Sequence, residues 1–331
     1  MENNKSQNNV TRRKFLGLSA AAATMAIVPV NFSILGEQKD KKPNSKFGGV
    51  QIGAITYSWR SMSPSAEDTL KYCVEDGISS IELMSNTIEL YAGVPQLPAR
   101  PERDASNEQK SAFQKTSKEI AEAQKKWRIS APMSKFEELR KMYNKAGVNI
   151  HIVKFSPESW SDEEVDYTFK VAKALGAKGV STEIGDVSAK KLGPFAEKHG
   201  LYSILHNHLQ PGTPGWTFEK FLEMSPRNLL NFDAGHYFGS TGLHPNGIIE
   251  KLHSRIASIH MKDKTGPKGT PPNTNMEWGK GETPISDILL LLKKNKWPIN
   301  VDIELEYPVP EGSDAVKEVK KCVEFCRNIL A

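Results

Sequence analysis

Acidic residues and histidines recur at short spacings in the second half of the chain, where together they could bind a metal ion or transfer protons. In chain order these groups are His206-Asn207-His208, Asp233-Ala-Gly-His236, His260-Met-Lys262-Asp263 and Asp302-Ile-Glu304-Leu-Glu306. Each group ends a short run of aliphatic residues, a pattern typical of a buried β-strand. The sequence therefore predicts four chemically capable groups at the carboxyl ends of four successive strands.

An aspartate, a glutamate and two histidines that meet at one point would form a mixed nitrogen and oxygen site for one divalent ion. Mn²⁺, Co²⁺, Zn²⁺, Fe²⁺ and Mg²⁺ all accept ligands of these kinds, so the identity of the metal stays open. A polar cluster held only by hydrogen bonds is the alternative. Structural roles are expected for His151, which lies early in a strand, and for His199 and His253, which lie on predicted helices.

The elements that must position these groups are short strands that alternate with amphipathic helices from residue 47 onward. The predicted strands are Val50–Tyr57, Ile78–Met84, Val148–Phe155, Gly179–Ile184, Leu201–His208, Leu229–Asp233, Ile256–Met261 and Asn300–Glu306. The helix boundaries are predicted from two capping boxes, Ser134 with Glu137 and Ser161 with Glu164, and from the glycines Gly147, Gly176 and Gly200.

Eight strand–helix units predict an α/β fold, a single (β/α)8 TIM barrel over residues 47–331. A doubly wound open sheet is the alternative, but no glycine-rich phosphate turn follows the first strand. The surplus length lies in residues 86–132, an insertion after the second strand that starts irregular and becomes a polar helix over about 107–128. Because this insertion follows the carboxyl end of a strand, we expect a lid or substrate wall. A surface decoration is the alternative.

These motifs resemble those of the sugar phosphate isomerase/epimerase family, the xylose isomerase-like TIM barrels that include ketose 3-epimerases and inosose dehydratases. The matching segments are Asn231-Phe-Asp233-Ala-Gly-His236, Ser258-Ile-His260-Met-Lys262-Asp263 and Val301-Asp302-Ile-Glu304. The resemblance implies that Asp233, His260 and Glu304 bind one divalent metal ion and that His236 binds substrate. The family's fourth ligand is a strand-five glutamate, whose place is taken here by His206.

Register decides two of these ligands. His208 competes with His206, and Glu306 competes with Glu304, because residues two apart on a strand share a face. The expected metal ligands are therefore His206, Asp233, His260 and Glu304.

The resemblance also implies removal of a proton α to a ketone whose carbonyl the metal polarises. Glu304 is expected to serve as base as well as ligand, and His206 or His208 as the conjugate acid. Lys262 is expected to be a cationic donor to a substrate oxygen, with a salt bridge to Asp263 as the alternative. The other expected substrate contacts are His208, Asn207, Glu183, Glu306, Tyr57 and Trp59.

Two activities fit this chemistry. One is a metal-dependent isomerase or epimerase acting on an unphosphorylated keto sugar, and the other is a 3-keto-glycoside lyase or hydratase of the same fold. The glutamate missing from strand five also acts as an acid and base in the epimerases, so both activities stay open. A non-catalytic sugar-binding barrel is a further alternative. The resemblance to endonuclease IV, which has the same type of barrel, lacks the additional strand-end histidines which that enzyme needs.

Residues 1–36 resemble a twin-arginine export signal, because Arg12 and Arg13 precede Phe15-Leu16 and a short alanine-rich apolar run. That run is too short for a stable membrane anchor. Residues 37–46 are expected to form a disordered leader. The mature protein is therefore expected outside the cytoplasm, in the periplasm, where an unphosphorylated sugar is the expected substrate.

The composition is ordinary for a soluble globular protein. Of the 331 residues 38% are hydrophobic and 25% are charged, and basic residues exceed acidic ones by five. Four basic residues and one acidic residue fall within 1–36, so the mature chain has no strongly basic surface for nucleic acid. Three cysteines do not make a disulfide framework. The expected partner is a small sugar or glycoside, and the oligomeric state stays open.

Overall fold

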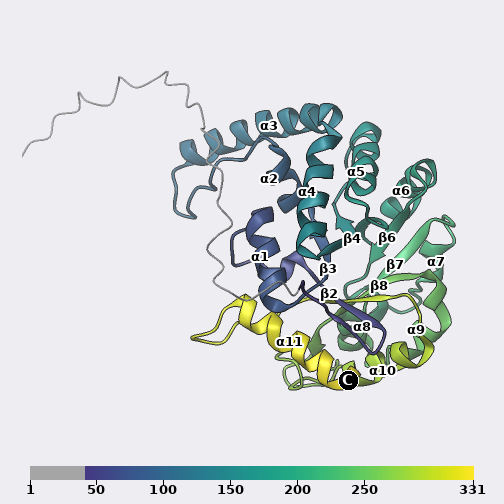
Figure 1. The fold of residues 1–331 in the computed structure, drawn as a ribbon. Helices are drawn as coiled ribbons and strands as arrows, with labels where there is room; N and C mark the ends of the chain where they lie inside the picture. Colours follow the sequence, from purple (N-terminus) through teal and green to yellow (C-terminus); the bar gives the residue numbers. More distant parts are fainter. Residues whose placement is uncertain (1–41) are drawn as a thin grey trace, which may run out of the picture. The chain divides into compact units, whose positions relative to one another are not determined.

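Eight parallel strands close into a barrel in the computed structural model, which describes residues 42–331 (Figure 1). The barrel strands are β2 (Val50–Ile55), β3 (Ser80–Met84), β4 (Asn149–Lys154), β5 (Gly179–Glu183), β6 (Tyr202–His206), β7 (Asn228–Asp233), β8 (Ile256–Met261) and β11 (Asn300–Ile303). Each strand pairs with the next in the chain, and the pairing of β11 with β2 closes the ring. The predicted TIM barrel and its eight strands are confirmed.

Helices surround this ring (Figure 1). They are α1 (Ala66–Asp76), α2 (Ser85–Ala92), α3 (Asn107–Ser130), α4 (Met133–Ala146), α5 (Asp162–Leu175), α6 (Asp186–His199), α7 (Glu219–Leu222), α8 (Ala234–Thr241), α9 (Asn246–Leu252), α10 (Ile285–Asn295) and α11 (Ala315–Leu330). The capping box of Ser161 and Glu164 is present, and Gly147, Gly176 and Gly200 end their helices in the left-handed conformation that glycine favours. The box predicted at Ser134 is wrong, because α4 already begins at Met133 after Pro132.

The insertion after β3 contains two helices rather than one. Helix α2 was not predicted, whereas α3 covers the predicted polar helix and extends it to Ser130. Arg128 ties the end of α3 to α2 and α5, because its guanidinium lies 2.8 Å from Glu89 and 3.2 Å from Glu164. In Figure 1 α3 lies across the top of α2 and α4. Whether the insertion acts as a lid stays a prediction.

The ordered domain begins slightly before residue 47. Ser45 is buried and donates to the Ile52 carbonyl, and a short outer strand, β1 (Lys46–Phe47), pairs antiparallel with β2. Residues 45 and 46 of the expected leader 37–46 therefore belong to the fold, whereas residues 37–41 of that leader and the expected signal over residues 1–36 lie outside the described residues. No helix in the described part of the chain has both the length and the hydropathy needed to cross a bilayer.

The histidines that were expected to be structural have structural partners. His151 bonds Ser80 and Asp302 inside the barrel, His199 bonds Asp166, and His253 stacks on Trp297. The three cysteines form no disulfide, as the sequence predicted, and all three are buried. These residues contribute to packing, whereas the polar groups at the carboxyl ends of the strands remain for chemistry.

Candidate metal centre

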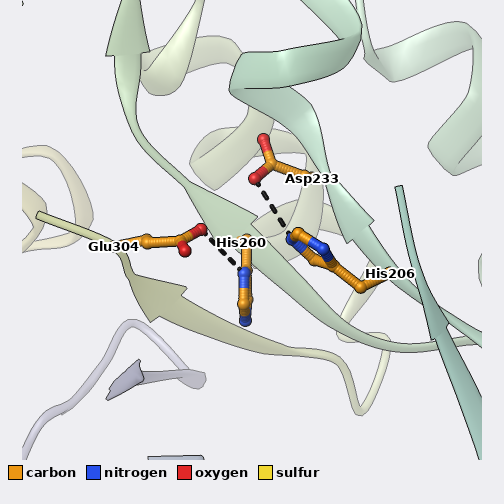
Figure 2. A group of neighbouring side chains, drawn as sticks. All are labelled: His206, Asp233, His260 and Glu304. Atoms are coloured by element: carbon orange, nitrogen blue, oxygen red, sulfur yellow. Dashed lines mark hydrogen bonds and ion pairs between the residues drawn. The ribbon is translucent and has the colours of Figure 1, made fainter. Parts of the chain in front are cut away.

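Four buried side chains meet at the carboxyl ends of β6, β7, β8 and β11. They are His206, Asp233, His260 and Glu304, and one ligand atom from each lies within 4.8 Å of all the others. Strand register brings them together, since His206 pairs with Asn231 and Asp233 pairs with His260. Figure 2 shows the two imidazoles and the two carboxylates pointing toward one another. We call this group the four-residue cluster.

The two carboxylate oxygens of Asp233 have different roles, one at the start of α8 and one in the cluster. Its Oδ1 atom caps α8 by accepting the His236 N–H at 2.6 Å, which leaves Oδ2 directed into the cluster. The side-chain amide of Asn207 forms two hydrogen bonds with the backbone of Asp233: it accepts from the N–H at 2.9 Å and donates to the carbonyl at 3.2 Å. Asn207 is fully buried, so the expected substrate contact is corrected to a positioning role.

Glu304 follows the last residue of β11 and stays attached to the neighbouring strand. Its N–H donates to the Met261 carbonyl at 3.0 Å, and its Oε2 atom lies 2.9 Å from Nδ1 of His260. Glu306 lies outside the cluster and accepts instead from Lys262 at 2.6 Å. Of the competing pairs, the structure thus brings Glu304 and His206 into the cluster and leaves Glu306 and His208 beside it.

One atom of the cluster, Nε2 of His206, has no hydrogen-bond partner among the described residues. It lies 3.4 Å from Oδ2 of Asp233 (Figure 2), the oxygen that the Lys262 ammonium contacts at 3.0 Å. Buried polar atoms are rarely left without a partner, and a divalent cation could bind this nitrogen together with the carboxylate oxygen. Two imidazoles and two carboxylates are also a suitable donor set for such an ion. The residues present therefore fit a metal ion.

Lys262 already places one cation against this group. Its ammonium lies 3.0 Å from Asp233, 2.8 Å from Glu304 and 2.6 Å from Glu306. Burial alone would lower the pKa of Lys262, but these carboxylates outweigh it and raise the pKa. The ammonium also lies 3.0 Å from Nε2 of His236. The alternative pairing with Asp263 does not form, because that carboxylate accepts backbone N–H groups from residues 279, 281 and 283.

The charges around the cluster keep the carboxylates ionised. Burial would raise the pKa of Glu304, but Lys262 and then His260 outweigh it and hold the pKa well below its usual range. Burial lowers the pKa of His236 to about 3, so this imidazole is neutral at physiological pH. A neutral His236 can accept a hydrogen bond from Lys262 and keep that ammonium directed toward the cluster.

A second wall of the site is formed by residues from the ends of β4, β5 and β6. Glu183 lies 2.8 Å from the Lys154 ammonium, 3.2 Å from Nδ1 of His206 and 3.6 Å from Nε2 of His208. Half of the His208 side chain is exposed, whereas His206 is fully buried. The His208 ring lies 4.9 Å from the ring of His236. His208 and Glu183 can therefore face a bound molecule, and His206 cannot.

The two aromatic residues expected to stack on a sugar differ in their surroundings. Trp59 is 3% exposed, donates to buried Asp76 at 3.1 Å and packs beside Tyr72, so it belongs to the core and that expectation is corrected. Tyr57 is exposed, but the Arg60 guanidinium lies 4.6 Å above its ring. Strand position alone did not distinguish these two environments.

Two charged residues of the site were not among the expected site residues. Lys154 is the last residue of β4, as Glu183 is of β5. A search for polar residues at the carboxyl ends of the strands could therefore have found Lys154. Glu82 lies within β3, is fully buried and contacts Nε2 of His260 at 2.8 Å. Its signal in the sequence was a carboxylate in the middle of the apolar run Ile81-Glu82-Leu83. Two further groups of three residues could hold a metal ion. One consists of Glu183, His206 and His208, and the other consists of Glu82, His260 and Asp302.

Comparison with known proteins confirms the resemblance. Residues 188–329 match the family model described as xylose isomerase-like TIM barrel. No curated protein matches the chain in sequence.

Several solved structures share the fold. A sugar phosphate isomerase/epimerase from Parabacteroides distasonis has a TM-score of 0.56 at 14% identity, over 86% of this chain and 96% of that one. A probable 3-DHS dehydratase from Bacillus anthracis gives 0.55 at 13% identity, over 83% and 98%. A D-psicose 3-epimerase gives 0.53 at 12% identity, over 85% and 99%. At these identities the likeness establishes the barrel fold and not the reaction.

Proposed function

From the xylose isomerase-like barrel and its four-residue cluster, we propose that the chain is a divalent-metal-dependent enzyme acting on an unphosphorylated keto sugar. The proposed reaction begins with removal of a proton from the carbon next to the carbonyl group. The observation that supports it best is the buried cluster itself, with an imidazole nitrogen that lacks a hydrogen bond among the described residues and an ammonium beside it.

The metal would be held by His206, Asp233, His260 and Glu304. When bound, it would supply a Lewis acid for the substrate carbonyl, which stabilises negative charge on the oxygen by several kcal/mol. Lys262 can donate a hydrogen bond to the same developing charge, because Glu306 and His236 hold its ammonium beside the cluster.

Glu304 is the proposed base. It is kept ionised by Lys262 and can accept a proton from a carbon held over the cluster. On the opposite wall, half-exposed His208 is better placed than buried His206 to return a proton or to protonate a leaving group. We therefore assign His206 to the metal and His208 to acid–base work.

Two outcomes of this shared first step are proposed. Reprotonation of the carbon would complete an isomerisation or epimerisation. Glu183 at the end of β5 lies beside His206 on β6, the residue that stands where the family has a glutamate, and so places a carboxylate near that position. Loss of the group on the neighbouring carbon would complete a lyase reaction on a 3-keto glycoside. His208 can serve either outcome, because its half-exposed imidazole lies beside Glu183 at the wall of the site, and an imidazole can move a proton near neutral pH.

Product analysis separates the two reactions. The metal-loaded protein would be incubated with unphosphorylated ketoses and 3-keto glycosides, and the products followed by NMR. An inverted carbon indicates epimerisation and a released aglycone indicates elimination. His208→Gln is expected to lower kcat by about 100-fold or more, whereas His244→Gln, which changes an exposed loop histidine, is expected to leave it unchanged. Metal binding without turnover of any sugar would favour a sugar-binding protein.

A further inference from the structure

A buried carboxylate stands behind one of the proposed metal ligands, on the side away from the cluster. Nδ1 of His260 faces Glu304 at 2.9 Å, and Nε2 of the same ring faces Oε2 of Glu82 at 2.8 Å. The side chains of His260 and Glu82 are both fully buried. The two nitrogens of the ring thus have separate partners, Glu304 at Nδ1 and Glu82 at Nε2, and the side-chain nitrogen of Asn231 also lies 3.0 Å from Nε2.

Glu82 is itself held in place. The Asn231 side-chain amide donates to the same Oε2 atom at 2.7 Å, and this amide lies on β7 two residues before Asp233. Side chains from the adjacent strands β7 and β8 and from β3, which is not adjacent to either in the ring, therefore meet inside the barrel and fix one carboxylate oxygen against one imidazole nitrogen. No other hydrogen bond reaches Oε2 of Glu82 within the described residues.

A histidine that binds a metal must be neutral, with the proton on the nitrogen opposite the metal. We propose that Glu82 is a positioning residue that keeps this proton on Nε2 of His260, so that Nδ1 is free to bind the metal. This inference rests on the proposed function, because it requires the metal. Glu82 does not touch substrate, since it is shielded from solvent behind His260.

The geometry distinguishes this contact from a similar one at the other histidine. Glu183 also lies behind His206, but the contact with Nδ1 is longer at 3.2 Å, and 37% of the Glu183 side chain is exposed. Lys154 and His208 share the same carboxylate. Glu82 has only the imidazole and the amide of Asn231 as hydrogen-bond partners, so its role in orienting His260 is the more specific one.

The test compares two substitutions of Glu82. In Glu82→Gln the amide oxygen can still accept from Nε2–H, and the orientation is fixed because the Asn231 amide must also donate to that oxygen. In Glu82→Leu no acceptor remains. Glu318→Leu is the matched control, since Glu318 on α11 is an equally buried carboxylate that lies outside the cluster and accepts a hydrogen bond from Tyr307. Thermal unfolding would check that each variant folds.

Two quantities are measured: the Zn²⁺ dissociation constant, by competition with a chelator, and the ¹⁵N shifts of the His260 ring in the zinc-loaded protein. Glu82→Leu is expected to weaken Zn²⁺ binding about 10- to 100-fold, with Glu82→Gln within about threefold of wild type and Glu318→Leu unchanged. The shifts should place the proton on Nε2 in wild type and in Glu82→Gln.

Wild-type affinity in Glu82→Leu, or a proton on Nδ1 in the wild type, would overturn the role of Glu82 while leaving the metal centre intact. Failure of the wild type to bind Zn²⁺ or any other divalent ion would instead overturn the proposed function. If Glu82→Leu does not fold, the ring shifts of wild type and Glu82→Gln still decide the question.

Discussion

The ammonium of Lys262 competes for the oxygens that the proposed metal ion would use. It lies within 3.0 Å of Asp233 and 2.8 Å of Glu304. Two cations this close repel each other in a buried site. Lys262→Met, which removes the charge and keeps most of the chain length, is therefore expected to tighten metal binding by about tenfold or more. Chelator competition with Mn²⁺ and Zn²⁺ measures this change.

Lys154→Met is the control for that prediction. Lys154 is also a largely buried lysine in the same site, but its ammonium pairs with Glu183 at 2.8 Å and not with the cluster. Its replacement is expected to change metal affinity by less than about threefold. Equal gains in the two variants would mean that overall charge, and not contact with the cluster, controls affinity.

The sequence predicted the members of the cluster well, because a residue that ends a barrel strand has a restricted position. Asp233, His260 and Glu304 all follow from that rule and from the family motifs. The sequence pattern does not distinguish Asn207, whose amide bonds the backbone of Asp233, from a residue that faces substrate. It also could not show that Trp59 turns into the core, because that depends on Asp76 at the end of a helix.

Among the elements, α1 ends in a buried carboxyl group that makes stability depend on pH. Burial raises the pKa of Asp76 to about 8, which outweighs the hydrogen bond from Trp59. The carboxyl therefore stays protonated in the folded state up to about that pH, whereas the unfolded chain releases the proton near pH 4. Between these values the unfolded state binds fewer protons, so stability falls as pH rises.

Asp76→Asn is expected to remove this dependence. The amide can still accept from Trp59 and does not ionise, so the variant should gain stability over wild type as pH rises from 5 to 8. The gain can reach at most about 1.4 kcal/mol per pH unit. Urea unfolding of both proteins at pH 5, 6, 7 and 8 measures it. Parallel stability curves would contradict the assignment.

The inserted helix α3 depends on one arginine, Arg128, whose side chain is only 11% exposed. Replacing Arg128 by Ala would leave Glu89 and Glu164 as buried carboxylates without their cation. Such a loss costs about 3–5 kcal/mol, which urea unfolding should detect. Arg227→Ala breaks a more exposed ion pair with Glu197 and should cost less than about 1 kcal/mol. Similar losses in the two variants would mean that Arg128 does not anchor α3.

Element boundaries show where sequence patterns succeed and fail. The eight strands were predictable because each is a short apolar run, and the capping box at Ser161 because its two residues bond each other across one turn. Helix α2 was missed because it follows β3 directly, with no capping residue that bonds its first turn. Ser134 has the pattern of a cap, but α4 begins one residue earlier.

For the whole molecule, the expected export signal lies outside the described residues and stays a prediction. Changing Arg12 and Arg13 together to lysine is expected to stop export through the twin-arginine route, because that route is identified by the paired arginines. Fractionation of cells that express the full chain, followed by immunoblotting, measures the periplasmic share. Unchanged export of the double variant would rule out this route for the chain.

The proposed function requires the cluster at the carboxyl end of the barrel to remove a proton next to a carbonyl group. The most direct measurement is the exchange of solvent deuterium into unphosphorylated ketoses and 3-keto glycosides, with wild type and Glu304→Gln compared at the same measured metal content. We expect deuterium on the carbon next to the carbonyl with wild type only. Equal labelling by both proteins, or no labelling of any such sugar by the metal-loaded wild type, would contradict it.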